Sequence, residues 1–167
     1  MKNRRRDDIL LQRVSESLNG RDYRGIARME TALHESAHIV IALILGEAVE
    51  AVSLGTSGLG GGAVFMRPRS RDVYSLRRHM IVVAAGTAVD GLPLPAAGSG
   101  ENSEDQNQLR SLAVEIVGKI GTQKRIDREI LRAKSKAAKL VKRHKVAIEE
   151  LAGHLLTLYG CLNRIKG

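Results

Sequence analysis

Cysteine is almost absent from this chain of 167 residues, which contains only Cys161. One thiol cannot form an internal disulfide, so a disulfide-stapled fold is excluded. Long hydrophobic runs are missing as well: the longest covers residues 39–45, whereas a membrane-spanning helix needs about 20 apolar residues. The basic N-terminal residues are not followed by an apolar stretch, so a secretory signal is not evident. We therefore expect a cytoplasmic protein with no membrane insertion.

Aromatic residues are also scarce, and this bears on how the charge is interpreted. The net charge of +9 is of the kind that nucleic-acid-binding proteins carry. Ten of the 27 basic residues, however, lie within residues 124–145, and that segment contains no aromatic side chain on which a base could stack. We interpret the segment as a solvated helix face and expect no nucleic-acid partner. A salt-dependent interface with an anionic partner is the alternative.

The length and composition indicate one main domain. We expect residues 1–25 to form a basic N-terminal arm or short helix and residues 26–167 to form the domain. Apolar residues at helical spacing predict a helix over residues 26–45 that stops at Gly46. Alternating residues 49–54 predict a strand, five glycines within 55–62 a turn, and residues 63–66 a second strand. Together these two strands predict a β-hairpin.

The second half of the sequence is predicted to be helical. A helix is expected over residues 72–89, with Val73 among its buried residues, followed by a loop over 91–100. Ser103 and Gln106 have the spacing of a capping box, which predicts a helix from there to about residue 117. Residues 122–159 are again helical in pattern, with a break near 142–145. The expected fold class is mainly α (α+β), with one small hairpin.

The pattern His34-Glu35-Ser36-Ala37-His38 is the strongest chemical signal in the chain. Two histidines four residues apart on a helix face the same side, where both can bind one Zn²⁺ ion. Glu35 projects around the helix, where its carboxylate can take the proton from a water molecule that attacks a carbonyl. The chain's composition would produce this pattern by chance only about 0.01 times. The alternative is a helix with two solvated or core-edge histidines.

A catalytic zinc site needs a third protein ligand, and spacing alone leaves several candidates. They are His79, Asp90, Glu101, Glu104, Asp105, His144 and His154. Asp105 falls in the first turn of its predicted helix, where the helix dipole favours an ionised carboxylate, but this residue could equally serve only to complement that dipole. His79 is expected to be an ordinary exposed helix histidine, although it is also a candidate oxyanion donor. A site of two histidines and a carboxylate could take Fe²⁺, Co²⁺ or Mn²⁺ in place of zinc.

The pattern continues beyond the zinc motif, and the chain resembles the peptidase domain of the FtsH family, the membrane-bound ATP-dependent zinc proteases. Residues 31–43 resemble the family's zinc-binding helix, and residues 52–65 resemble the hairpin that follows it. The remaining matches are an apolar helix, the start of a later helix and a closing helix pair, at residues 81–90, 99–113 and 126–162. The resemblance implies a zincin-like helical metallopeptidase domain with Zn²⁺ as its cofactor.

The resemblance also assigns roles to residues at matching positions. It implies that His34, His38 and Asp105 bind the zinc ion and that Glu35 is the general base. Asp90 takes the place of an acidic residue near the metal, which implies support of the ligands rather than ligation. The second strand of the hairpin corresponds to the edge on which extended substrate adds as a further strand, a role that falls on Ala63, Val64, Phe65 and Met66.

The chain also departs from the family. It contains neither a Walker-type phosphate-binding motif nor an apolar segment long enough to cross a membrane. We therefore expect a stand-alone zinc metalloendopeptidase that hydrolyses unfolded or flexible polypeptides without an ATPase of its own. The expected partners are the polypeptide substrate, a separate ATPase, unfoldase or adaptor, and further copies of the chain in an oligomer, with no ring specified by the residues.

A second class of function uses the same fold without catalysis. In this alternative the chain is a catalytically inactive, metal-binding interaction or regulatory module. The intact Glu35 favours the enzyme, because a module that only binds metal has little physical need for a carboxylate at that position. Replacement of Glu35 by glutamine separates the two, since it should abolish hydrolysis and spare metal binding.

Overall fold

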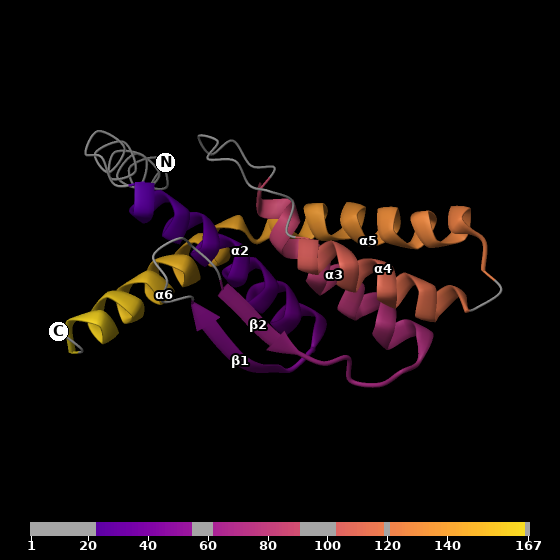
Figure 1. Cartoon of the computed structure of the whole chain (residues 1–167), viewed down its shortest axis with the longest axis horizontal. Helices are drawn as coiled ribbons and strands as arrows, with labels where there is room; N and C mark the ends of the chain where they lie inside the picture. Colours follow the sequence, from indigo (N-terminus) through magenta and orange to yellow (C-terminus); the bar gives the residue numbers. More distant parts are fainter. Residues whose placement is uncertain (1–22, 55–61, 91–102, 119–120, 166–167) are drawn as a thin grey trace.

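The computed structural model describes residues 23–54, 62–90, 103–118 and 121–165. In chain order these contain α2 (Tyr23–Leu45), β1 (Val49–Leu54), β2 (Gly62–Met66), α3 (Val73–Asp90), α4 (Ser103–Val117), α5 (Gln123–Arg143) and α6 (Lys145–Ile165) (Figure 1). The prediction of a mainly α fold with one small hairpin is confirmed. Helix α2 begins at Tyr23, so the predicted N-terminal arm overlaps the helix by three residues and otherwise lies outside the described part of the chain.

The end of α2 is fixed by a glycine, as the sequence predicts. Gly46 adopts a positive φ of 72°, which a residue without a side chain reaches at no steric cost. Its N–H donates to the carbonyl of Leu43 at 3.2 Å, and the N–H of Glu47 donates to the carbonyl of Ala42 at 2.9 Å. These two hydrogen bonds satisfy two of the carbonyl groups in the last turn of the helix. The turn that they form leads directly into β1 and leaves Glu47 buried.

Strands β1 and β2 form an antiparallel hairpin that packs on α2. Val52 pairs with Val64 and Ala51 with Phe65, with an irregularity between Val49 and Ala51. Strand β2 begins at Gly62, so the last residue of the predicted turn belongs to the strand, and the rest of the turn lies outside the described residues. In the view of Figure 1 the hairpin lies below α2, whereas α5 lies above it.

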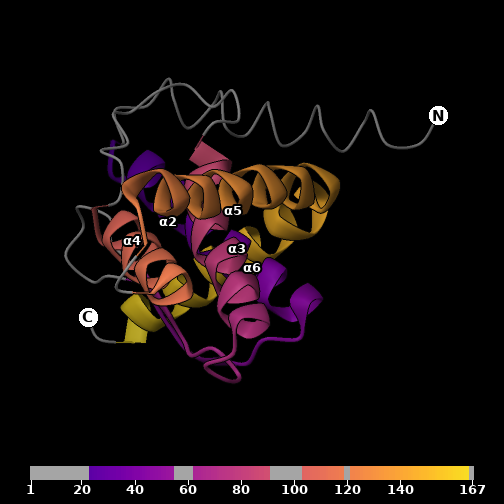
Figure 2. The same ribbon diagram turned by 90° about the vertical axis from the view of Figure 1, so that its right-hand side faces the viewer.

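Helix α3 is the central element of the bundle. It packs against α2, α4 and α5, and in the view of Figure 2 α5 crosses it and α4 lies to its left. Asp72 begins it as an N-cap, because its Oδ1 atom accepts the N–H of Ser75 at 2.9 Å. Val73, predicted to be buried, is instead 44% exposed at the first residue of the helix, where fewer neighbouring residues cover it.

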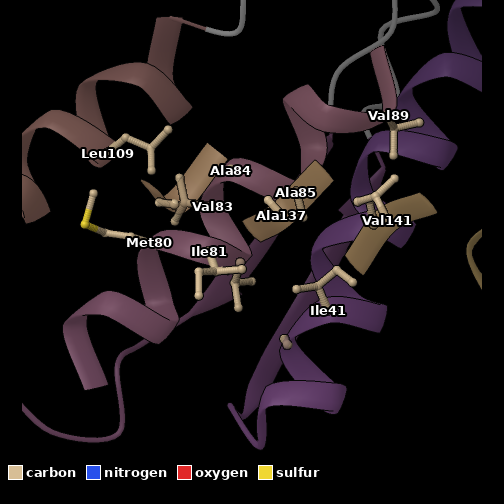
Figure 3. Packing of buried hydrophobic residues seen from close by; sticks show 14 of the residues in the cluster. Ile41, Met80, Ile81, Val83, Ala84, Ala85, Val89, Leu109, Ala137 and Val141 are labelled. Atoms are coloured by element: carbon tan, nitrogen blue, oxygen red, sulfur yellow. The ribbon is translucent and has the colours of Figure 1, made fainter. Parts of the chain in front are cut away.

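The core lies between α2, α3, α4 and α5, and α6 adds Ile148 and Ala152 to it. Figure 3 shows apolar side chains from all four helices in one cluster, among them Ile41, Val83, Leu109 and Val141. Both helices of the α2–α3 contact bury small residues: Ala37 of α2 and Ala84 and Ala85 of α3 have no exposed surface. Small residues let two helices approach closely. This contact brings the backbone of α3 up to the histidines of α2.

The last two helices are joined without a loop. The N–H of His144 donates to the carbonyl of Leu140 at 2.9 Å and so ends α5, and α6 begins at the next residue. The break predicted near residues 142–145 is therefore confirmed, although α6 extends past the predicted end. Helix α5 is tied to α3 by Glu129, whose carboxylate accepts two hydrogen bonds of 2.9 Å from Arg77.

Candidate metal centre

The zinc-motif residues lie in a part of α2 that is covered on all sides, because residues 32–39 are all buried. His34 is 9% exposed, Glu35 3% and His38 5%. The histidines are therefore not solvated, and the other half of that alternative, two core-edge histidines that bind no metal ion, stays open. Polar groups buried to this degree require partners, and these come from α3 and α4.

The donor atoms of His34, His38 and Asp105 converge. The Nε2 atom of His34 lies 3.1 Å from Oδ2 of Asp105 and 3.2 Å from Nε2 of His38. The Nε2 atom of His38 lies 3.4 Å from the same carboxylate oxygen. A tetrahedral ion with bonds of about 2.0–2.1 Å separates its ligand atoms by about 3.3 Å. The three atoms therefore have the spacing of one face of a tetrahedral site and could hold a metal ion.

The tautomer of His38 adds a chemical reason for a cation at this point. Its Nδ1 atom lies 2.9 Å from the carbonyl oxygen of Val82, which can only accept a hydrogen bond, so Nδ1 carries the proton. A neutral His38 ring then presents the Nε2 lone pair to the cluster, beside the carboxylate of Asp105. Two electron-pair donors converge there with His34, and one metal ion would satisfy all three ligands.

The carboxylate of Asp105 is held in its ionised form. Burial by itself would raise the pKa of this group, but the contacts with His34 and His38 outweigh burial and hold the pKa well below its usual range. Asp105 also lies in the first turn of α4, where the helix dipole favours a negative charge. A carboxyl group must be deprotonated to bind a metal ion, so this residue is ready to act as a ligand.

Glu35 lies beside the cluster but is not one of its members. Burial raises the pKa of its carboxyl group, while the nearby histidines act in the opposite direction. A carboxylate with a raised pKa is a stronger base than one at the surface. Its position next to the two ligands, together with this basicity, suits it to accept a proton at the centre.

Among the residues that the structure describes, no other candidate for the third ligand joins the cluster. Asp105 and not Glu104 joins the histidines. Glu104 is exposed, although its charge contributes to the raised pKa of Glu35. His144 lies at the junction of α5 and α6, and His154 is exposed on α6. Glu101 and the side chain of Asp90 lie outside the described part of the structure, so the supporting role of Asp90 stays a prediction.

The prediction that His79 is an exposed helix histidine is wrong. This residue is only 1% exposed because α3 is covered by neighbouring helices on several sides. Burial lowers the pKa of its imidazole, so the ring is neutral near pH 7. Its Nδ1 atom has no hydrogen-bond partner among the described residues, and its Nε2 atom lies 3.5 Å from Nε2 of Gln108. His79 is therefore a buried residue of α3 and not a ligand.

Two residues of α3 at the centre were not identified from the sequence. Val82 contributes its carbonyl oxygen to His38, and a backbone group carries no signal in the residue type. Gly86 faces both imidazole rings at very short range. A sequence signal for Gly86 does exist, since an isolated glycine inside a helical pattern often marks a close approach of another group.

The comparisons with family models and with curated proteins found no relative of this chain. No family model matches the chain, and no curated protein matches it significantly. The resemblance to the FtsH peptidase domain therefore stays a prediction that rests on the motifs. Among the described residues, no helix is long and apolar enough to cross a membrane.

Proposed function

We propose that this chain is a zinc-dependent metalloendopeptidase with a zincin-like fold. The observation that carries the proposal is the convergence of His34, His38 and Asp105 at ligand spacing, with the buried carboxylate of Glu35 beside them. The three ligand residues come from two helices that are far apart in the sequence. A structural role alone would not require three metal-binding side chains to face one another in the interior.

Each residue of the centre has a separate task in this proposal. His34, His38 and Asp105 hold the ion, and three protein ligands leave a coordination position open, as catalytic zinc sites do. When bound, a zinc ion would polarise the peptide carbonyl and lower the pKa of water. The hydrogen bond from His38 to Val82 orients the ring so that its Nε2 atom lies near Asp105, where it would be available to hold the ion.

Glu35 acts as the general base and then as the general acid in this proposal. Its carboxylate accepts a proton from the attacking water and then delivers it to the leaving amine, which must be protonated to depart. The raised pKa of Glu35 favours the first of these steps, because it makes the carboxylate a stronger base toward the water proton. General acid–base catalysis of this kind contributes about 10²- to 10⁴-fold to a rate.

The substrate is proposed to be an unfolded or flexible polypeptide. Strand β2 pairs with β1 along one edge, and its second edge is unpaired within the described part of the sheet. An extended peptide can add to such an edge through main-chain hydrogen bonds. This edge is the proposed site of substrate binding, with Ala63, Val64, Phe65 and Met66 in the strand. A separate ATPase, unfoldase or adaptor would supply folded substrates, and self-association is proposed as well.

Hydrolysis of an unfolded casein carrying quenched fluorophores tests the proposal. We expect the purified chain with zinc to release internal fragments without ATP, to lose activity with a chelator and to regain it with added zinc. Folded proteins should resist cleavage under the same conditions. A chain that binds zinc stoichiometrically but cleaves no unfolded substrate would contradict the enzyme and favour the metal-binding interaction module.

A further inference from the structure

Helix α3 touches the two histidines at a residue that has no side chain. A Cβ atom built on Gly86 would lie 2.5 Å from the Cε1 and Nε2 atoms of His34 and 2.6 Å from the Nε2 atom of His38. Real Cβ atoms essentially never approach another atom closer than 3.0 Å. The Cβ atom at position 86 would meet the Nε2 atoms of His34 and His38, which are the two nitrogens that lie close to Asp105. Any side chain at position 86 would therefore occupy space beside the metal-binding atoms.

The imidazole rings have little freedom to move away from such a side chain. His38 is tied to the α3 backbone by the hydrogen bond from Nδ1 to Val82, four residues before Gly86 on the same helix. His34 packs edge-on against His38, with 4.8 Å between the ring centres, and contacts Asp105 on α4. Both rings are buried. A ring displaced by a methyl group would have to break at least one of these contacts.

The two residues before Gly86 show that buried positions of α3 can accommodate a Cβ atom. Ala84 and Ala85, the two preceding residues, are completely buried and carry their methyl groups within the core. Glycine weakens a helix relative to alanine, so position 86 carries a residue that is unfavourable for the helix. The contact with the histidines gives a physical reason for that residue.

We propose that Gly86 is a positioning residue of the metal centre, whose missing side chain allows His34 and His38 to direct their Nε2 atoms at one ion. This inference rests on the proposed metal centre and is independent of peptidase activity. It assigns a function to a residue that neither binds the ion nor touches the substrate. Its effect is exerted through the geometry of the two imidazole ligands.

The test is zinc affinity of the G86A variant, measured by competition with a chromophoric chelator, with circular dichroism as the check on folding. We expect zinc binding at least about 10-fold weaker than in the wild type, the size typical of changes that misplace a ligand. Gly153→Ala is the matched control, because it makes the same change in α6 at a position where a Cβ atom meets nothing within 4 Å. Its zinc affinity should equal that of the wild type.

The outcomes separate this inference from the proposed enzyme. Equal zinc affinity of G86A and the wild type would overturn the role of Gly86, and a wild type that binds no zinc would overturn both proposals. If the wild type binds zinc and G86A does not, but neither hydrolyses casein, the role of Gly86 is supported and the peptidase is contradicted. Peptidase activity therefore does not decide whether Gly86 positions the two histidines; zinc affinity does.

A second pair of variants covers the case in which G86A fails to fold. In a chain that carries both His34→Ala and His38→Ala, the rings that a methyl group would meet are gone, so adding Gly86→Ala should leave the melting temperature unchanged or raise it. The same loss of stability with and without the rings would place the clash elsewhere and overturn the proposal.

Discussion

The Nδ1 atom of His38 donates a hydrogen bond to the carbonyl oxygen of Val82 at 2.9 Å, so a ring of α2 is oriented by the backbone of α3. The metal-binding geometry therefore depends on how these two helices pack and not on the motif alone. Asp105 from α4 completes the cluster at 3.1 Å from His34. Three helices must be in place before the donor atoms converge, which links the proposed chemistry directly to the fold.

Removal of the charge on Asp105 should weaken metal binding. The D105N variant keeps the shape of the side chain but replaces an anionic ligand with a neutral amide, and we expect zinc affinity to fall at least about 100-fold. Glu104→Gln is the control, because this neighbouring residue is exposed and does not belong to the cluster. Competition with a chromophoric chelator measures both variants. Equal losses in D105N and E104Q would show that net charge near α4, and not ligation, sets the affinity.

The ion pair between Arg77 and Glu129 should contribute to stability. Glu129 is mostly buried between α3 and α5, and its pKa lies below the usual range chiefly because of the hydrogen bond from Arg77. Since Arg77 is about half exposed to solvent, we expect Glu129→Gln to lower the free energy of unfolding by only about 1–2 kcal/mol at pH 7. Urea unfolding measures the change, and Glu150→Gln on the exposed side of α6 is the control.

This contribution should also depend on pH in one direction. A carboxyl group whose pKa is lowered in the folded state stabilises the protein above its ordinary pKa of about 4.3, and that stabilisation disappears as the pH falls through the folded-state pKa. The difference in free energy of unfolding between the wild type and E129Q should therefore shrink between pH 7 and pH 3. A difference that stays constant over this range would rule out the ion pair as its source.

Two glycine-to-alanine changes should have opposite effects on stability. Gly46 has a φ of 72°, so alanine there is strained even though the surrounding space is open, and we expect a loss of about 1 kcal/mol. Gly153 lies within α6 with open space around it, so alanine should increase the free energy of unfolding by about 0.5–1 kcal/mol. Thermal and urea unfolding measure both. A stabilised G46A would contradict the left-handed end of α2.

Much of the fold follows from local patterns in the sequence. The helical spacing of residues 26–45, the stop at Gly46 and the alternation around the glycine-rich turn predict α2 and the hairpin closely, because each element is specified by residues near one another. The break between α5 and α6 follows in the same way from a polar cluster. The exposure of Val73 and the burial of His79 could not be predicted, since both depend on which faces of α3 its neighbours cover.

The candidate site was predictable only in part. The spacing of His34 and His38 predicts a metal-binding pair on its own, whereas the choice of Asp105 among seven candidates relied on the family resemblance. The structure brings Asp105 to the histidines through the packing of α4 on α3. Val82 takes part through a backbone atom, and the importance of Gly86 appears only when two helices are placed side by side.

The most direct test of the account is ATP-free hydrolysis of unfolded casein by the wild type and by Glu35→Gln, each loaded with the same amount of zinc. Glutamine has nearly the shape of glutamate but cannot accept the proton from water, and Glu35 is not a ligand. We predict that the wild type cleaves the substrate and that E35Q binds zinc equally but is at least about 100-fold slower. Equal hydrolysis by the two proteins, or none by the zinc-loaded wild type, would contradict the proposed enzyme.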